Sequence, residues 1–181
     1  MNVSEAILTR RSIRRYSNQP IPRELICEIL SEARWAPSWK NSQTVRYLVV
    51  DDAQRKNAIS AAPNMPVFNS KVIAQAPVLI VMVTKKGISG YTGGEPDTTL
   101  DSGWQMFDAG IAAQTLCLAA WERGLGSLIM GLYDEAALPE LLKDQLAADE
   151  QITALVALGY AADQPKGPGR KELEAAAEFV K

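Results

Sequence analysis

The chain has 181 residues, of which 47% are hydrophobic, and its 19 basic and 21 acidic side chains give a formal net charge of -2. This size and apolar share are ordinary for one globular domain with a buried core, while the balanced charge supplies no field to hold a nucleic acid or an anionic membrane. Residues 1–10 are too polar for a signal peptide, and the longest apolar stretch is interrupted by polar side chains, so we expect a cytoplasmic protein.

The sequence contains no histidine and only two cysteines, Cys27 and Cys117. Without histidine, the chain lacks the commonest acid–base group near neutral pH, a usual zinc ligand, and the Ser-His and Cys-His nucleophilic pairs. Each cysteine stands alone in an apolar helical pattern, which is typical of a small buried side chain rather than of a disulfide or metal site. If the protein is an enzyme, we therefore expect an organic cofactor to supply most of the chemistry, without a metal.

Helices and strands alternate in the first half of the chain. Asn2 and Glu5 have capping-box spacing at the start of the first helix, and Pro37 ends the apolar pattern of the second. β-branched runs indicate buried strands. In chain order, we predict a helix at 2–9, a helix at 25–33, a strand at 46–51, a polar helix at 52–61 and a strand at 76–84.

The second half contains a long apolar helix. Its apolar residues surround nearly the whole circumference, which indicates burial at the centre of the fold or against a partner chain. The glycine-rich loop before it has a length that is often functional. Alternation alone would favour a parallel α/β sheet. The predicted elements are a loop at 85–102, a helix at 103–123, a strand at 127–133, a helix at 134–147, a strand at 152–160 and a tail from 161.

Two basic segments are candidates for binding a phosphate. Residues 10–16 hold four arginines and Ser12 within seven positions, a cluster that suits a phosphate. Residues 165–173 add three cations after a stiff Pro- and Gly-rich turn. A solvated loop and a disordered tail are the alternatives, although apolar residues near the chain end give the tail something to bury.

Two further segments suit contact with a flat ligand. Residues 36–43 are dense in short polar side chains, and Asn and Gln amides can read the imide edge of a heterocycle. In residues 124–131 the glycines have phosphate-loop spacing, but Leu132 and Tyr133 replace the required Lys-Ser/Thr, which excludes a nucleoside triphosphate site. The remaining functional interpretation of residues 124–131 is that their glycine backbone lets a flat ligand approach closely. An ordinary helix-terminating turn is the alternative for both segments.

In this order, the four segments resemble the FMN-dependent nitroreductase family. The matching motifs are R-R-S-x-R at residue 10, A-P-S-x-x-N-S-Q at 36, D-x-x-x-x-x-Q-x-x-x-L-A-A at 108 followed by G-L-G-S, and Arg170-Lys171 in the tail. The resemblance covers nearly the whole chain. It implies one FMN-binding domain over 1–181, an α+β fold with a mainly antiparallel central sheet flanked by helices, and an intertwined homodimer with FMN at the subunit interface. We prefer this fold to the parallel sheet.

Carried over residue by residue, the resemblance implies a phosphate end of the FMN site. Arg10, Ser12 and Arg14 would hold the phosphate and the ribityl chain, and Arg170 would reach the same phosphate, with Lys171 as a further candidate. A guanidinium near the flavin would also favour its two-electron reduced form. Two other members of the motifs are assigned to the cofactor site, Arg11 and Pro37.

The resemblance also implies a ring end. Ser38 would come from the other subunit, and Asn41 would face the pyrimidine edge or the ribityl chain. Gly131, with its neighbour Met130, would place a backbone amide near flavin N5, and Asn69 would face the carbonyl edge. This chain departs from the family in two places. Its Thr44-Val45 replaces the usual Pro-Trp, and Met130 replaces a frequent second glycine, which would narrow access to one flavin face.

The implied activity is transfer of electron pairs from NAD(P)H through FMN to a small electron-poor acceptor such as a nitroaromatic or a quinone. Donor and acceptor use one flavin face in turn, which gives ping-pong kinetics. Trp39, Trp104 and Tyr91 offer aromatic surface for a flat acceptor, and the 85–102 loop is a candidate lid. Two alternatives stay open: a dimer that stores flavin or senses redox state without turnover, and a structural protein without a cofactor.

Overall fold

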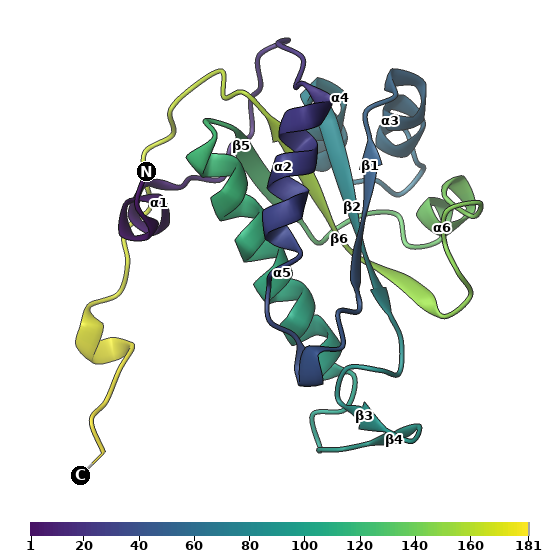
Figure 1. Cartoon of the computed structure of the whole chain (residues 1–181). Coiled ribbons are helices and arrows are strands. Elements are labelled where there is room, and N and C mark those ends of the chain that lie inside the picture. The colour runs from purple at the N-terminus through teal and green to yellow at the C-terminus, as the bar shows by residue number, and fades with distance from the viewer. Residues whose placement is uncertain (181) are drawn as a thin grey trace.

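The computed structural model describes residues 1–180, and its helices cover a central four-stranded sheet (Figure 1). The elements of the first half are α1 (Val3–Thr9), α2 (Arg23–Ala33), the 3-10 turn η1 (Trp39–Asn41), β1 (Val45–Val50), α3 (Ala53–Ser60), α4 (Val67–Gln75) and β2 (Val78–Lys85). Those of the second half are β3 (Tyr91–Thr92), β4 (Glu95–Pro96), α5 (Gly103–Glu122), β5 (Gly126–Met130), α6 (Ala137–Leu141), β6 (Glu150–Gly159) and η2 (Leu173–Ala175).

The sheet has the strand order β1-β2-β6-β5, and each neighbouring pair is antiparallel. This confirms the antiparallel sheet implied by the family resemblance, and the parallel sheet suggested by alternation alone is wrong. One reason is that two helices, α3 and α4, join β1 to β2 and return the chain to the same end of the sheet. The other is that β2 and β5, which α5 connects, do run in the same direction, but β6 lies between them.

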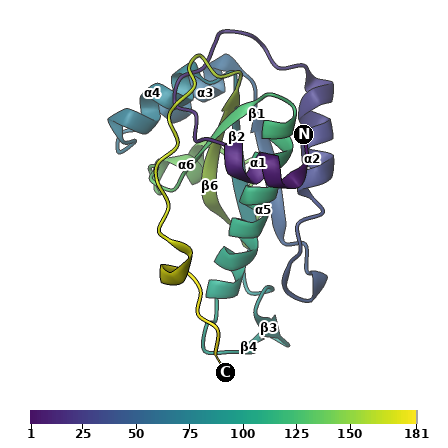
Figure 2. The same ribbon diagram turned by 90° about the vertical axis from the view of Figure 1, so that its left-hand side faces the viewer.

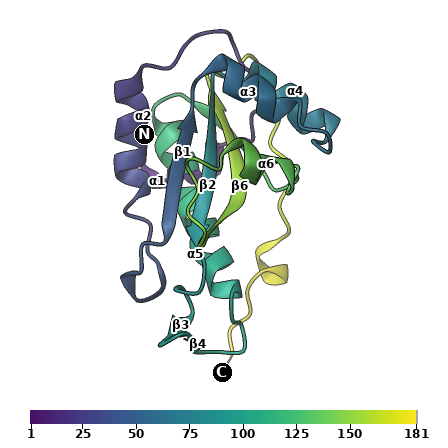
Figure 3. The ribbon, with the colours of Figure 1, turned by 90° about the vertical axis from the view of Figure 1, so that its right-hand side faces the viewer.

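Helices cover both faces of the sheet. The helices α2 and α5 pack on one face, and α3, α4 and α6 pack on the other (Figures 1 and 3). The central strand β2 serves both layers, because Leu79, Val81 and Val83 enter one core cluster while Ile80 and Met82 enter the other. This period of two is the geometry of a strand buried on both sides.

Several predicted elements differ in extent from the observed ones. The helix predicted at 134–147 is only the short α6, and the strand predicted at 127–133 ends at Met130. The helix α4 was not predicted at all. Buried side chains were expected for both cysteines, which is correct for Cys117 and wrong for Cys27, whose position on α2 is exposed. Among residues 1–180, the structure has no helix that is long and apolar enough to cross a membrane.

The C-terminal tail leaves the body of the protein after β6. It runs past α1 and extends beyond the helical layer, with η2 as its one short turn (Figure 2). Its final large apolar residues are almost fully exposed, Phe179 at 92% and Val180 at 93%. In this protomer the tail therefore has no surface that buries its apolar end.

Candidate cofactor site

The basic segment after α1 forms a short strand-like edge beside β5. The Ile13 N–H donates to the Ser127 carbonyl at 2.9 Å, and Ser12 and Ser127 form a parallel bridge. The buried Tyr16 hydroxyl donates to the carbonyls of Ile13 and Ala157, at 2.8 and 3.2 Å, and burial raises its pKa. These contacts fix the segment against the sheet, which disfavours the alternative of a solvated loop.

The arginines of this segment are not equivalent. Arg14 is exposed and its Nη1 donates only to the nearby Ser12 carbonyl, at 3.1 Å. Among the described residues, no carboxylate pairs with Arg10 or Arg14, whereas Arg15 pairs with Asp163 at 3.7 Å. The charges of Arg10 and Arg14 are therefore available to an anion.

The Arg11 side chain is used for contacts within the protein, unlike that of Arg14. Its Nη1 donates to the carbonyls of Leu8 and Arg10, both at 2.8 Å, and its guanidinium packs against Gly167 of the tail. It lines a cavity of about 670 Å³ between α1, the end of α5 and the start of the tail. The Arg11 side chain thus contacts the Arg10 backbone and the tail at Gly167, and its role in the cofactor site stays a prediction.

The end of β5 offers open backbone. A Cβ atom added at Gly131 would meet no atom within 4 Å, whereas one added at Gly126 would lie 2.3 Å from Cγ1 of Ile13. At about 3.3 Å per residue, β5 carries the chain about 13 Å from Ser127 to Gly131. One strand edge therefore joins the unpaired arginines to an exposed glycine.

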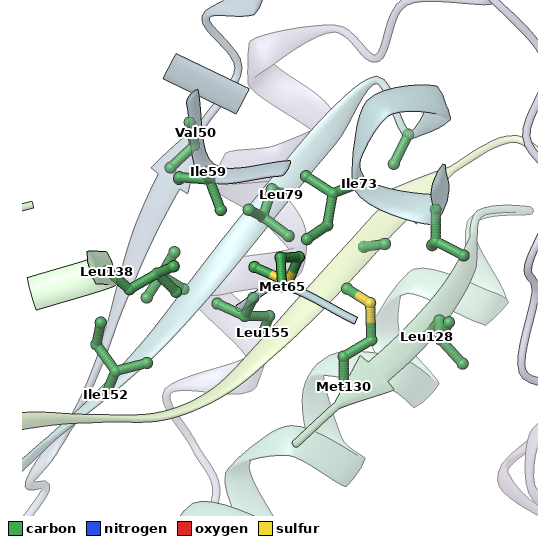
Figure 4. Close-up of a cluster of buried hydrophobic side chains, with 14 of the residues drawn as sticks. Val50, Ile59, Met65, Ile73, Leu79, Leu128, Met130, Leu138, Ile152 and Leu155 are labelled. Atoms are coloured by element: carbon green, nitrogen blue, oxygen red, sulfur yellow. The ribbon is translucent and has the colours of Figure 1, made fainter. Parts of the chain in front are cut away.

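Met130 does not face the space beside Gly131. Its side chain is only 3% exposed and packs in the core with Leu128 (Figure 4). In this protomer the Met130 side chain therefore does not fill the space beside Gly131, and its effect on access to the flavin stays a prediction. The second departure is accommodated at Val45, which begins β1 and pairs with Thr84, whereas the buried Thr44 hydroxyl has no hydrogen-bond partner among the described residues.

Asn69 lies next to this glycine but uses its side chain for a protein contact. On the first turn of α4, its Nδ2 donates to the Leu132 carbonyl at 2.7 Å, and the side chain is buried. Val67, Phe68 and Leu132 are exposed around it, Leu132 at 71%. Asn69 thus holds an apolar patch beside Gly131, while its expected contact with a flavin carbonyl edge stays a prediction.

Asp134 fixes the chain immediately after this patch. Its carboxylate accepts N–H bonds from Asn64 at 2.8 Å, Ala136 at 3.1 Å and Ala137 at 2.9 Å. These bonds, with that of Ala137 the strongest influence, hold the pKa of Asp134 below its ordinary value. The segment from Gly131 to Asp134 is therefore tied both to α4 and to the loop before it.

The second candidate segment, residues 37–43, lies at the other end of α5. Lys40, Asn41 and Gln43 have positive φ values of 47°, 55° and 50°. Such left-handed backbone in a residue other than glycine costs of the order of 1 kcal/mol or more, and it persists only where its surroundings hold it. The Ser38 Oγ accepts the Gln43 N–H at 2.9 Å, and the Trp39 N–H donates to the Asp108 carboxylate.

Aromatic rings gather beside this turn. The ring centroids of Trp39 and Trp104 are 4.6 Å apart, and those of Trp104 and Phe107 are 5.5 Å apart. Lys40 ties the turn to the hairpin that follows β2, because its Nζ lies 3.0 Å from Asp97 Oδ2. The predicted aromatic surface exists for the two tryptophans, and the loop predicted as a lid is a hairpin docked on the same turn.

The candidate residues thus form separate groups within one protomer. Arg10, Ser12 and Arg14 lie near the C-terminal end of α5, while the 37–43 turn contacts Asp108 near its N-terminal end. At about 1.5 Å per residue, Asp108 and Glu122 are about 21 Å apart along the helix. Pro37, Ser38 and Asn41 are therefore not brought to the basic segment. The tail touches the basic segment where Gly167 packs against Arg11, but among the described residues the Arg170 Nη1 donates to the carbonyls of Pro168 and Gly169, so the contact of Arg170 and Lys171 with a phosphate stays a prediction.

Comparison with known proteins supports the resemblance seen in the motifs. The model of the nitroreductase family matches residues 7–160, which include the basic segment, the 37–43 turn and the end of β5. The chain belongs to the nitroreductase family. The match ends before the tail, so it does not extend to Arg170 and Lys171.

Three proteins illustrate what this chain is similar to. An NADH dehydrogenase of Thermus thermophilus is 30% identical over 198 residues, covering 96% of this chain and 94% of the relative. An FMN reductase [NAD(P)H] of Bacillus subtilis is 29% identical, covering 71% of this chain and 53% of the relative. A solved structure from Desulfovibrio desulfuricans, in complex with FMN, has 26% identity and a TM-score of 0.78, covering 100% of this chain and 99% of the other.

Sequence reasoning missed the residues that hold the site in place. In the sequence, Tyr16 only ends the basic segment, Asp108 only begins the third motif, and Asp134 only begins the helix predicted at 134–147. Each of them contacts a segment remote in sequence, as in the bond from Trp39 to Asp108 across 69 positions. The only available signal was the presence of a single polar residue within an apolar pattern, as for Asp108 in the long helix.

Proposed function

We propose that this chain, as one domain over 1–181, is an FMN-dependent oxidoreductase that passes electron pairs from NAD(P)H to a small electron-poor acceptor such as a nitroaromatic or a quinone. Family membership supports the class of reaction and the cofactor. The observation that carries the proposal is the edge of β5, where unpaired guanidinium groups and an open glycine lie at the two ends of one strand.

The residues along this edge fit FMN. Its phosphate suits Arg10, Ser12 and Arg14, because guanidinium groups bind phosphate oxygens with charge-assisted hydrogen bonds. The open backbone at Gly131 suits the approach of a flat ring, and the separation of about 13 Å along β5 suits an elongated ligand with an anionic end. We assign Arg170 and Lys171 to the same phosphate, since both side chains are exposed and have no acidic partner among residues 1–180.

A second subunit completes this site in the proposal. Pro37, Ser38 and Asn41 lie at the far end of α5, so they reach an FMN molecule only on the partner. Exposed apolar residues on α1 and α5 and in the tail supply the surface for such a partner. They are Val3, Ile7, Leu8, Met106, Phe107, Phe179 and Val180. Obligate interfaces of this kind commonly bury more than about 2,000 Å² in total.

Bound FMN supplies hydride acceptance at N5 and onward electron transfer, and the protein supplies position and charge. The Gly131 backbone orients the ring edge, and the neighbouring Phe68 and Leu132 exclude water from it. Asn69 and Asp134 keep this backbone in place through their bonds to the adjoining segment. NAD(P)H and the acceptor need the same open face and therefore bind in turn. Since the chain contains no histidine, solvent is the proposed proton source.

The decisive experiment is an anaerobic titration of the purified yellow protein with NADH and with NADPH. We expect at least one nucleotide to abolish the visible flavin absorbance and an added quinone or nitroaromatic to restore it. Mass spectrometry of the heat-released ligand should identify FMN rather than FAD. Double-reciprocal plots at several acceptor concentrations should give parallel lines. Intersecting lines would exclude sequential use of one face, and a flavin that neither nucleotide reduces would favour storage or sensing.

A further inference from the structure

Asp108 is a buried carboxylate that joins three parts of the fold. It lies on the second turn of α5 and is only 3% exposed. Its Oδ1 and Oδ2 accept the Trp39 N–H at 3.1 and 3.0 Å, and the Ser89 Oγ donates to Oδ2 at 2.5 Å. The carboxylate thus connects the helix to the 37–43 turn and to the segment that follows β2.

The turn depends on contacts from outside itself. Its left-handed residues are Lys40, Asn41 and Gln43, none of which is a glycine. Asn tolerates this backbone, but Lys40 and Gln43 do not favour it, so tertiary contacts are needed to hold the turn. The bond from Gln43 to Ser38 closes the turn internally. Among the described residues, the Trp39 N–H bond to Asp108 is the one hydrogen bond from the backbone of the turn to α5, and the ring contact of Trp39 with Trp104 adds to it.

The buried Asp108 carboxylate in its turn needs the hydrogen bond that the 37–43 turn donates to it. A buried charge is costly unless hydrogen bonds compensate it. Among the described residues, the donors to Asp108 are the Trp39 N–H and the Ser89 hydroxyl, and no basic side chain pairs with it. Displacement of the turn would remove the one backbone donor of a buried anion, so the observed position of the turn is favoured over displaced ones.

We infer that Asp108 is a positioning residue that acts in trans: it holds Ser38 and Asn41 in the conformation that completes the FMN site of the partner subunit. It does not touch the cofactor. Through Ser89 the same carboxylate holds the hairpin segment beside the turn. This inference rests on the proposed function, because it assigns a role within the shared FMN site.

Single variants test the positioning role. Asp108→Ala should raise the dissociation constant for FMN by about tenfold or more, since bonds to a charged group have this order of strength. Asp108→Asn keeps one acceptor oxygen, so its dissociation constant for FMN should lie between those of Asp108→Ala and the wild type. The matched control is Leu116→Ala on the same helix, fully buried and remote from the turn. It should lower the melting temperature without changing FMN affinity. Equal FMN affinity in Asp108→Ala and the wild type, or equal losses in the alanine variants of Asp108 and Leu116, would overturn the inference.

A mixed dimer tests action across the interface. Two tagged full-length chains are co-expressed, one with Asp108→Ala and the other with Arg14→Ala, after each homodimer has been shown to bind FMN weakly. If Asp108 acts on the partner's site, both defects fall on one site, and the mixed dimer should bind one FMN per dimer with wild-type affinity. If no site of wild-type affinity is found, Asp108 acts within its own subunit and the inference is wrong. A wild-type protein that binds no FMN would instead refute the proposed function itself.

Discussion

Gly126 begins β5 and Gly131 follows its last residue, and an added side chain should have different effects at the two positions. At Gly126 it should lower stability, and at Gly131 it should slow flavin reduction. In Gly126→Ala the new Cβ would lie 2.3 Å from Cγ1, 2.7 Å from Cβ and 3.1 Å from Cγ2 of Ile13. Overpacking of this kind typically costs about 1–3 kcal/mol. For a domain of this size, 1 kcal/mol corresponds to about 2–4 °C, so the melting temperature should fall by about 2–12 °C. The displaced segment carries Ser12 and Arg14, so FMN affinity should fall as well.

Gly131→Val should leave the stability of the fold nearly unchanged and slow the reduction of the flavin. Its Cβ meets nothing within 4 Å in the protomer, so unfolding free energy should change by no more than about 0.5 kcal/mol. The added methyl groups would occupy the space proposed for the flavin edge. Stopped-flow measurement of flavin reduction by NAD(P)H should therefore show a slower reaction than in the wild type. A fully active Gly131→Val variant would remove this residue from the site.

The cause of the Gly126→Ala loss is tested by a double variant. Ile13→Ala removes the atoms that the new methyl group would strike, so the two substitutions share one contact and should not be additive. Urea unfolding should show that the double variant loses less stability than the sum of the two single losses. An unchanged melting temperature in Gly126→Ala, or strict additivity, would contradict the packing of Ile13 against this glycine.

Three further predictions follow from single contacts. Tyr16→Phe removes the donor to the Ile13 and Ala157 carbonyls and should cost about 1–3 kcal/mol in urea unfolding, with weaker FMN binding. Gly110→Ala adds a methyl to the exposed stripe of α5, where it meets nothing in the protomer; the helix should gain intrinsic stability while light scattering shows a weaker dimer. Asp134 has a lowered pKa in the fold, so the unfolded state binds more protons. Its contribution to stability is present above the ordinary pKa of about 3.9 and is lost as pH falls, and Asp134→Asn should flatten the acid limb of a stability profile.

The sequence predicted most elements correctly because their signals are local. The Asn2 side chain accepts the Glu5 N–H at 2.9 Å, as the capping spacing indicated. The strand arrangement could not be predicted from local signals. The helix α4 begins after Pro66 with a mixed polar and apolar sequence, and without it β1 and β2 read as parallel strands joined by a single crossover helix, whereas they pair antiparallel. The motif-based resemblance corrected this error because it draws on the order of segments along the whole chain.

The candidate site likewise has features that the local sequence predicts and contacts that it does not predict. The lack of a side chain at Gly131 was readable from the sequence, but the open space around it was not, since an added Cβ would meet nothing at Gly131 and would strike Ile13 at Gly126. The contacts that position it were not readable either. Asn69 bonds to Leu132 across 63 positions, and Trp39 bonds to Asp108 across 69. Such pairs arise only when the tertiary fold brings two segments together, and neither member has a spacing that indicates its partner.

In the proposed dimer, the separation of the site residues along α5 constrains how the two subunits meet. The exposed face of α5 includes Met106, Phe107 and Gly110, and a second helix can pack closely against it. In a dimer with two-fold symmetry the same patch contacts itself. If the two α5 helices cross antiparallel, the N-terminal end of one lies toward the C-terminal end of the other. The turn held by Asp108 then faces the partner's basic segment beside β5. One symmetric contact would thus build two complete sites, each with its phosphate end on one chain and the 37–43 turn on the other.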